Sequence, residues 1–183
     1  KDIWVAAGSL PQDVPSDFYT QLIHLLKNKG VRVFFDANGE ALRAGLSDPP
    51  FLVNPDISET EDFVGFSIHN YDDAKRAVLP FLRLGVEYVA LSIDGLGLLL
   101  ASQQEMMLAT PPKVSIRNVT GAGDALMAGM AYGFARGMDL REIARLGAAF
   151  SAVAVTTVSL ASVKNSDVEA MLPRVEVRTV NVM

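Results

Sequence analysis

Short runs of apolar residues recur along the chain, and segments with helical spacing of their apolar residues lie between them. The continuous apolar or β-branched runs are at residues 3–7, 31–35, 51–53, 88–92 and 97–101. Apolar positions at helical spacing, or short helix-forming stretches, are found at 17–29, 39–46, 72–84, 125–136 and 140–155. Strands that are apolar along their whole length are typical of a parallel sheet covered on both faces. The pattern therefore predicts the α/β class, a three-layer αβα sandwich with a mostly parallel sheet.

Turn residues and polar residues mark where the predicted elements end. Gly30 and Gly85 stop two helices, and the Asp94-Gly95 turn joins the runs at 88–92 and 97–101. A further extended piece leads through Pro111-Pro112 toward residue 121. Ligands of open α/β sheets bind beyond the carboxyl ends of the strands. We therefore expect the polar residues at these ends to share one crevice: Ser9, Asp36, Asn54, Asp56, Ser92 and Asp94.

The composition narrows the classes of protein. No linker or repeat divides residues 1–183, which we expect to form a single domain, and half of the residues are hydrophobic. A net charge of −5 argues against a nucleic-acid or membrane-surface partner. The uncharged stretch 146–163 is weakly apolar, and we interpret it as a buried helix followed by a loop. The absence of cysteine excludes disulfide and thiolate chemistry and is compatible with a cytoplasmic location.

The segment from Asn118 to Asp124 carries the most specific chemistry. Gly121, Ala122 and Gly123 let the backbone approach a ligand closely, and a predicted helix begins there. The start of a helix favours a phosphate, because its N–H groups are unpaired and its dipole is positive. Asp124 stands at this cradle, where an acid is suited to handle a proton beside a phosphoryl group. The alternative is that Asp124 is only a helix N-cap.

Several segments in this order together resemble the PfkB (ribokinase-like) family of sugar kinases. They are Ala7-Gly8-Ser9-Leu10-Pro11, Asp36 with Gly39-Glu40-Ala41-Leu42, the Pro55-containing strand end and, most specific of all, Gly121-Ala122-Gly123-Asp124. The combination looks most like the branch that contains 1-phosphofructokinase and tagatose-6-phosphate kinase. The closing segment 172–177 also resembles that branch's final strand.

The resemblance implies a role for each part of the loop. Asp124 would be the base that accepts the proton of the substrate hydroxyl, and Gly121, Ala122 and Gly123 would form the anion hole. A positioned carboxylate can take this proton as the attacking oxygen gains charge. Backbone N–H groups at the helix start can supply the charge stabilisation that phosphoryl transfer needs.

The resemblance also implies a metal and a nucleotide site. Asp56 and Glu59 stand where the family usually has Asn-x-x-Glu, and we expect them to hold a hydrated Mg²⁺; two solvated acids in the first turn of a helix are the alternative. Ser92, Gly95 and Gly97 correspond to a turn that contacts ATP in the family, although Asp94 replaces a glycine there. The alternative is a plain hairpin turn without a nucleotide contact. Ala149 and Ala152, with Ala148, would border the adenine or only allow close helix packing.

The implied activity is transfer of the γ-phosphoryl group of ATP to a hydroxyl of a sugar phosphate. A nucleoside kinase, such as a pseudouridine kinase, and a non-catalytic nucleotide-binding module are the alternatives. PfkB proteins are substantially longer, so the chain looks like the C-terminal, nucleotide-binding portion without the N-terminal part and its lid. The sheet edge exposed in this way would invite pairing with a second copy, as in a homodimer.

Overall fold

The structure is a computed structural model that describes residues 2–93, 97–158 and 163–181. Its strands belong to one sheet, in which neighbours follow the chain order from β1 to β7. The chain divides into two compact units. The first comprises Lys1–Asp94 and Ala101–Gln104, and the second comprises Gly95–Leu100 and Glu105–Met183.

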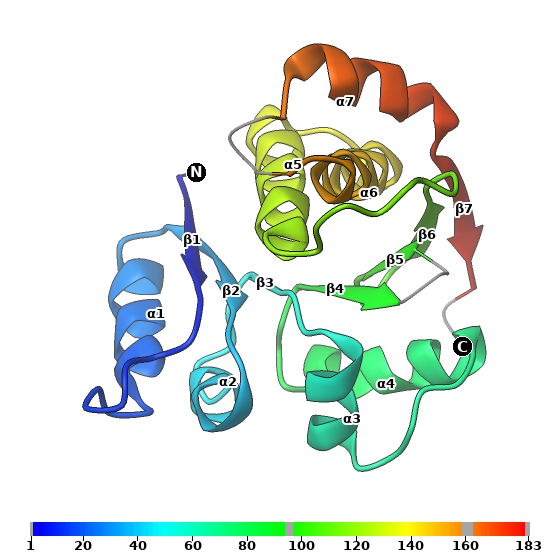
Figure 1. Cartoon of the computed structure of the whole chain (residues 1–183). Coiled ribbons are helices and arrows are strands. Elements are labelled where there is room, and N and C mark those ends of the chain that lie inside the picture. The colour runs from blue at the N-terminus through cyan, green and yellow to red at the C-terminus, as the bar shows by residue number, and fades with distance from the viewer. Residues whose placement is uncertain (1, 94–96, 159–162, 182–183) are drawn as a thin grey trace. The chain divides into compact units, whose positions relative to one another are not determined.

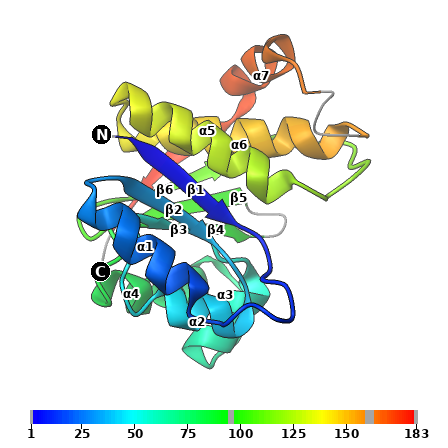
Figure 2. The same ribbon diagram turned by 90° about the vertical axis from the view of Figure 1, so that its left-hand side faces the viewer.

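The first unit is built from parallel strands connected by helices. The strands are β1 (Ile3–Ala7), β2 (Arg32–Asp36), β3 (Leu52–Val53) and β4 (Tyr88–Ile93). The helices are α1 (Phe18–Asn28), α2 (Gly39–Gly45), α3 (Ile57–Val64) and α4 (Tyr71–Arg83). Each strand pairs in parallel with the next one. Because parallel crossovers are right-handed, strands in sequential order place all their helices on one face, as Figures 1 and 2 show.

The apolar runs of the sequence form the core of this unit. Phe34 and Phe35 of β2, Val53 of β3 and Leu91 of β4 are completely buried. Ile23 of α1 and Phe81 of α4 are also completely buried. The helix α4 starts where the Asn70 side chain accepts a hydrogen bond from the Asp73 N–H at 3.0 Å. The apolar runs of β2, β3 and β4 are therefore buried strands, as predicted, whereas the prediction of a buried strand is wrong for most of β1.

The strand β1 stands at one end of the strand order, next to β2, and pairs with no other strand of the described residues. All of its residues are apolar, yet Trp4 is 52% exposed and Val5 is 43% exposed. An apolar edge strand is a surface that favours pairing with another strand. The expectation of a homodimer stays a prediction.

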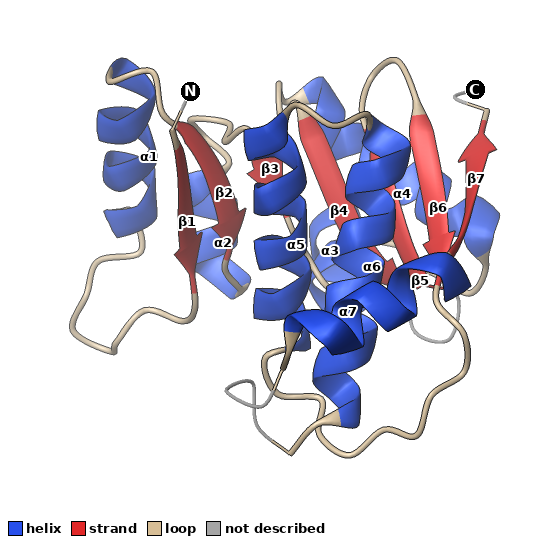
Figure 3. Cartoon of the chain, turned by 90° about the horizontal axis from the view of Figure 1, so that it is seen from above, coloured by secondary structure: helices blue, strands red, loops and turns tan. Residues whose placement is uncertain are grey.

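The second unit contains the remaining strands and helices. Its strands are β5 (Gly97–Ala101), of which Gly97–Leu100 belong to this unit, β6 (Met106–Thr110) and β7 (Glu176–Val180). Its helices are α5 (Ala122–Arg136), α6 (Leu140–Thr156), α7 (Asn165–Met171) and the 3-10 helix η2 (Leu172–Arg174). β7 runs antiparallel to β6, so the sheet is mostly parallel but mixed at this end. In Figure 3, the helices α5, α6 and α7 lie on the side of the sheet that faces the viewer.

Glycines bring α5 and α6 close together, and the two helices lie side by side in Figures 1 and 2. A Cβ atom on Gly129 would lie 2.8 Å from the Leu146 carbonyl oxygen and 2.9 Å from Phe150 Cδ2. A Cβ atom on Gly147 would lie 2.9 Å from Met130 Cγ. Real Cβ atoms essentially never make contacts shorter than 3.0 Å, so the absence of a side chain at both positions sets the spacing of the helices.

The predicted helices and strands are confirmed within one or two residues at most ends, except that α5 begins three residues earlier than expected. The stretch 146–163 contains the end of α6 at Thr156, as the interpretation of a buried helix and a loop requires. Among the helices of the described ranges, none combines the length and hydropathy that a bilayer crossing requires. The closing segment 172–177 is not one strand, because Leu172–Arg174 form η2 and the strand begins at Glu176.

Candidate active site

The loop before Gly121 is held by the side chain of Asn118. Asn118 Oδ1 accepts a hydrogen bond from the Thr120 N–H at 3.0 Å, and Asn118 Nδ2 donates to the Val158 carbonyl at 3.3 Å. The N–H groups of Arg117 and Asn118 both donate to the Val155 carbonyl. These bonds fasten the loop to the C-terminal end of α6. Asn118 is the positioning residue that sequence reasoning missed, although an Asn whose side chain accepts from the N–H two residues further on is a known turn former.

The glycine loop opens α5, as predicted. Gly121 is the N-cap residue with a left-handed φ of +80°, a conformation that favours glycine. Ala122, Gly123 and Asp124 are the first three helical residues. Among the described residues, no acceptor is found for the N–H groups of Gly123 and Asp124. Two unpaired N–H groups at the positive end of a fifteen-residue helix would favour a bound anion, and anion binding here stays a prediction.

Asp124 lies in the first turn of α5 and is exposed to solvent. The N-cap alternative is wrong, because Gly121 occupies that position. Within the described ranges, the Asp124 carboxylate has no hydrogen bond or ion pair. A carboxylate that is solvent-accessible and free of internal partners can accept a proton from a bound molecule.

The residues of the expected nucleotide turn differ in what surrounds them. Ser92 is half-buried in β4, and Gly95 lies outside the described residues. Gly97 has a φ of +106°, and a Cβ atom there would lie 2.2 Å from the Ala109 carbonyl oxygen. Glycine is therefore required at position 97 by the close approach of the β6 backbone. Contact of Ser92 or Gly97 with a nucleotide stays a prediction.

The small residues of α6 are part of the core. Ala149 is completely buried, and Ala148 and Ala152 are nearly so. Their position on the helix that Gly147 brings against Met130 supports the packing explanation. Contact of Ala149 and Ala152 with an adenine ring stays a prediction.

Asp56 and Glu59 form a capping box at the start of α3. Asp56 Oδ1 accepts from the Glu59 N–H at 2.7 Å, and Glu59 Oε2 accepts from the Asp56 N–H at 2.9 Å. This reciprocal arrangement stabilises the helix start without a metal. Each carboxylate uses one oxygen in the box, so the other oxygen of each can bind water or a hydrated cation.

Further polar groups of the first unit lie beside this pair. Burial raises the pKa of Glu59, the hydrogen bond from the Asp56 N–H opposes this, and the negative charges of Asp56 and Asp36 add to the rise. Asn54 Nδ2 donates to Asp36 Oδ2 at 3.3 Å, while Asn54 Oδ1 is buried with no partner among the described residues. Neighbouring carboxylates repel each other because both are negative, and a bound cation relieves this repulsion.

Within the described residues, no three acidic, histidine or cysteine side chains converge as a metal cage. Mg²⁺ does not need such a cage, since it keeps several waters and is often held by one or two carboxylates. Asp56 and Glu59 therefore fit a hydrated Mg²⁺ ion, and their assignment to a metal stays a prediction.

The sequence is similar to those of curated 1-phosphofructokinases. The chain is 36% identical over 149 residues to a 1-phosphofructokinase of Rhodobacter capsulatus, covering 81% of this chain and 47% of that protein. It is 32% identical over 176 residues to a 1-phosphofructokinase of Bacillus subtilis, covering 96% of this chain and 57% of that protein. The chain thus spans about half the length of the curated relatives it matches.

A solved structure of phosphofructokinase-2 from Escherichia coli in complex with potassium superposes with a TM-score of 0.86 at 28% identity. The superposition covers 93% of this chain and 56% of that one, and it confirms the predicted three-layer α/β fold. The family model described as pfkB family carbohydrate kinase matches residues 1–166. The free carboxylate at a glycine-opened helix and the match over most of the sequence lead to one conclusion: the chain belongs to the pfkB family of carbohydrate kinases.

Proposed function

We propose that the protein is an ATP- and Mg²⁺-dependent kinase that transfers the γ-phosphoryl group of ATP to a hydroxyl of a sugar phosphate. The single observation that carries the proposal is the pairing of unbonded N–H groups with a free carboxylate in the first turn of α5. One binds an anion and the other accepts a proton, and phosphoryl transfer to an alcohol needs both.

In this proposal Asp124 takes the proton from the attacking hydroxyl. The free N–H groups of Gly123 and Asp124 stabilise the negative charge on the phosphoryl oxygens during transfer, whereas the Ala122 N–H already donates to the Val119 carbonyl. Asn118 keeps the loop fastened to α6, which holds these donors in place. Ser92, Gly95, Gly97, Ala149 and Ala152 are proposed to border the nucleotide.

Asp56 and Glu59 are the proposed metal-associated acids. When bound, Mg²⁺ neutralises charge on the phosphate oxygens. Asp56 and Glu59 would hold its waters with the carboxylate oxygens that the capping box does not use. The relatives named 1-phosphofructokinase support fructose 1-phosphate as the first acceptor to test.

The decisive experiment replaces Asp124 by Asn in the complete protein. Asn keeps the size and most of the polarity but cannot accept the proton. We expect ATP affinity measured by calorimetry to stay nearly unchanged and turnover to fall by about 10²–10⁴-fold. Asp139→Asn is the matched control, because Asp139 caps α6 and Asn is an equally good cap. Unchanged turnover in Asp124→Asn would refute the base assignment.

The acceptor is identified by assaying the complete protein with fructose 1-phosphate, tagatose 6-phosphate, fructose 6-phosphate and pseudouridine. Preference for a sugar phosphate supports the proposal, and preference for pseudouridine identifies a nucleoside kinase with the same mechanism. ATP binding without transfer to any acceptor would favour a non-catalytic binding module.

A further inference from the structure

A cavity of about 500 Å³ lies in the second unit, away from the glycine loop. It is lined by Met138, Glu142, Arg145, Leu146, Leu172, Pro173 and Val175. Met138 follows the C-terminal end of α5, whereas the glycine loop precedes its N-terminal end. Fifteen helical residues rise about 22 Å, so the cavity is separate from the proposed active site.

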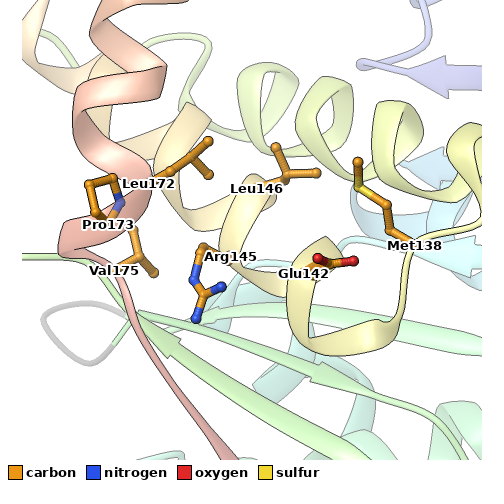
Figure 4. Close-up of a pocket in the computed structure, with 7 residues that line it drawn as sticks. All are labelled: Met138, Glu142, Arg145, Leu146, Leu172, Pro173 and Val175. Atoms are coloured by element: carbon orange, nitrogen blue, oxygen red, sulfur yellow. The ribbon is translucent and has the colours of Figure 1, made fainter.

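The cavity has an apolar wall with opposite charges beside it. Figure 4 shows Leu172, Pro173 and Val175 on one side and Met138 on the other, with residues of α6 between them. Leu146 and Val175 are buried, so they form a firm apolar surface. Sites for small molecules typically have volumes of about 300–1,000 Å³, and the volume of this cavity lies within that range.

The two charged residues of the cavity are not paired. Glu142 and Arg145 are three residues apart on α6, so their side chains share one face of the helix. In the part of the chain that the structure describes, neither side chain has a hydrogen bond or an ion pair. Arg141, one turn before Arg145, does have partners, because its guanidinium donates to the Val177 carbonyl and to Thr179 Oγ1.

A half-buried arginine without a partner loses part of its hydration and gains no protein contact in return. A bound carboxylate would supply two parallel hydrogen bonds to the guanidinium. A lone anion would also meet the Glu142 carboxylate, which repels it. A ligand that carries a cationic group as well as a carboxylate satisfies both side chains.

We propose that this cavity binds a small zwitterion with an apolar body, of which an α-amino acid with an apolar side chain is the simplest example. Its carboxylate would contact Arg145, its ammonium group would lie beside Glu142, and its side chain would pack on Met138, Leu146 and Leu172. The proposal is independent of the proposed kinase activity.

Calorimetric titration of this chain with L-leucine and L-phenylalanine tests the proposal. We expect saturable binding with a Kd of about 1 mM or tighter. The amide of each amino acid lacks the carboxylate, and the N-acetyl form lacks the ammonium group. We expect each derivative to bind about tenfold more weakly or worse, as expected for the loss of a charge-assisted contact.

Substitutions of the charged cavity residues test whether the amino acid binds in the cavity. Arg145→Gln and Glu142→Gln should each weaken binding about tenfold. Arg174→Gln is the matched control, because Arg174 is exposed, lies between two cavity residues in sequence and does not line the cavity. Its Kd should not change. Circular dichroism of each variant checks that it is folded.

Three outcomes overturn the proposal. One is no binding up to about 10 mM ligand, which is ten times the weakest expected Kd. Another is equal binding of the amide derivatives or of Arg145→Gln. The third is self-association in sedimentation experiments that Arg145→Gln abolishes, which would assign the cavity to a second copy of the chain.

Discussion

The contact between α5 and α6 gives a prediction whose sign can be worked out. Replacing Gly129 by Ala would normally stabilise a helix by about 1 kcal/mol. Here the new methyl group meets the Leu146 carbonyl oxygen at 2.8 Å, and ordinary contact begins at 3.4 Å. The carbonyl would have to retreat by the difference, about 0.6 Å. A gap of this size forfeits a quarter to a half of each neighbouring van der Waals contact.

The carbonyl is backbone within α6, so the helix must move as a whole. Overpacking of this kind costs about 1–3 kcal/mol. After the gain in helix propensity, we expect Gly129→Ala to lower the free energy of unfolding by up to about 2 kcal/mol. For a chain of 183 residues this corresponds to a fall in Tm of up to about 8 °C.

Urea unfolding followed by circular dichroism, together with scanning calorimetry, measures the change. Ala128→Gly is the matched control, because Ala128 is exposed in the interior of the same helix and reports helix propensity. It should destabilise by about 1 kcal/mol. If Gly129→Ala instead stabilises the protein by as much as Ala128→Gly destabilises it, the reasoning from close packing is refuted.

Two further predictions concern carboxylates of the first unit. Asp56→Ala removes the capping box of α3 and should cost about 1 kcal/mol in a urea titration, while Asp56→Asn should cost less because Asn caps well; equal losses would contradict the capping role. Asp48 has a lowered pKa because it accepts a hydrogen bond from Lys27 and, 3.0 Å away, faces His24. The stabilisation from Asp48 is therefore present above the ordinary pKa of 3.8 and is lost as pH falls through the lower folded value. Asp48→Asn should lower stability by up to about 1 kcal/mol at neutral pH, and the difference from the parent protein should vanish in titrations well below pH 3.8; a difference that persists there would argue against this account.

The buried strands β2, β3 and β4 could be predicted because most of their residues are apolar and consecutive in the sequence. The segment Val33–Phe35 contains no polar residue and is completely buried in β2, whereas the charged residue before it, Arg32, is half-buried. The helix after Gly121 could be predicted for a similar reason, since small and apolar residues follow a loop of glycines. Its exact start at Ala122 depends on the left-handed conformation of Gly121, which composition alone does not fix.

The pair Asp56 and Glu59 shows where sequence reasoning reaches its limit. The spacing of a capping box and that of two metal-associated acids are the same in sequence. Only coordinates show that each carboxylate accepts from the other residue's N–H. By contrast, the proximity of Asp36 to Glu59, on a different element, agrees with the expectation that polar residues at the strand ends share one crevice.

The end of the chain was harder to predict because its signals are weak. The helix α7 is short, and its first turn is polar. Pro173 in η2 cannot donate a ladder hydrogen bond, which delays the strand until Glu176. β7 is polar and largely exposed, so it lacks the apolar pattern that marked the buried strands.

The path of the backbone between the two compact units has a practical consequence. The chain leaves the first unit after Asp94, returns to it at Ala101 and leaves again after Gln104. A split-protein reporter or a recombined chimera that joins at one breakpoint after Asp94 would therefore separate residues 101–104 from the rest of their unit. In a chimera with a homologous kinase, residues 101–104 must come from the same parent protein as the rest of the first unit.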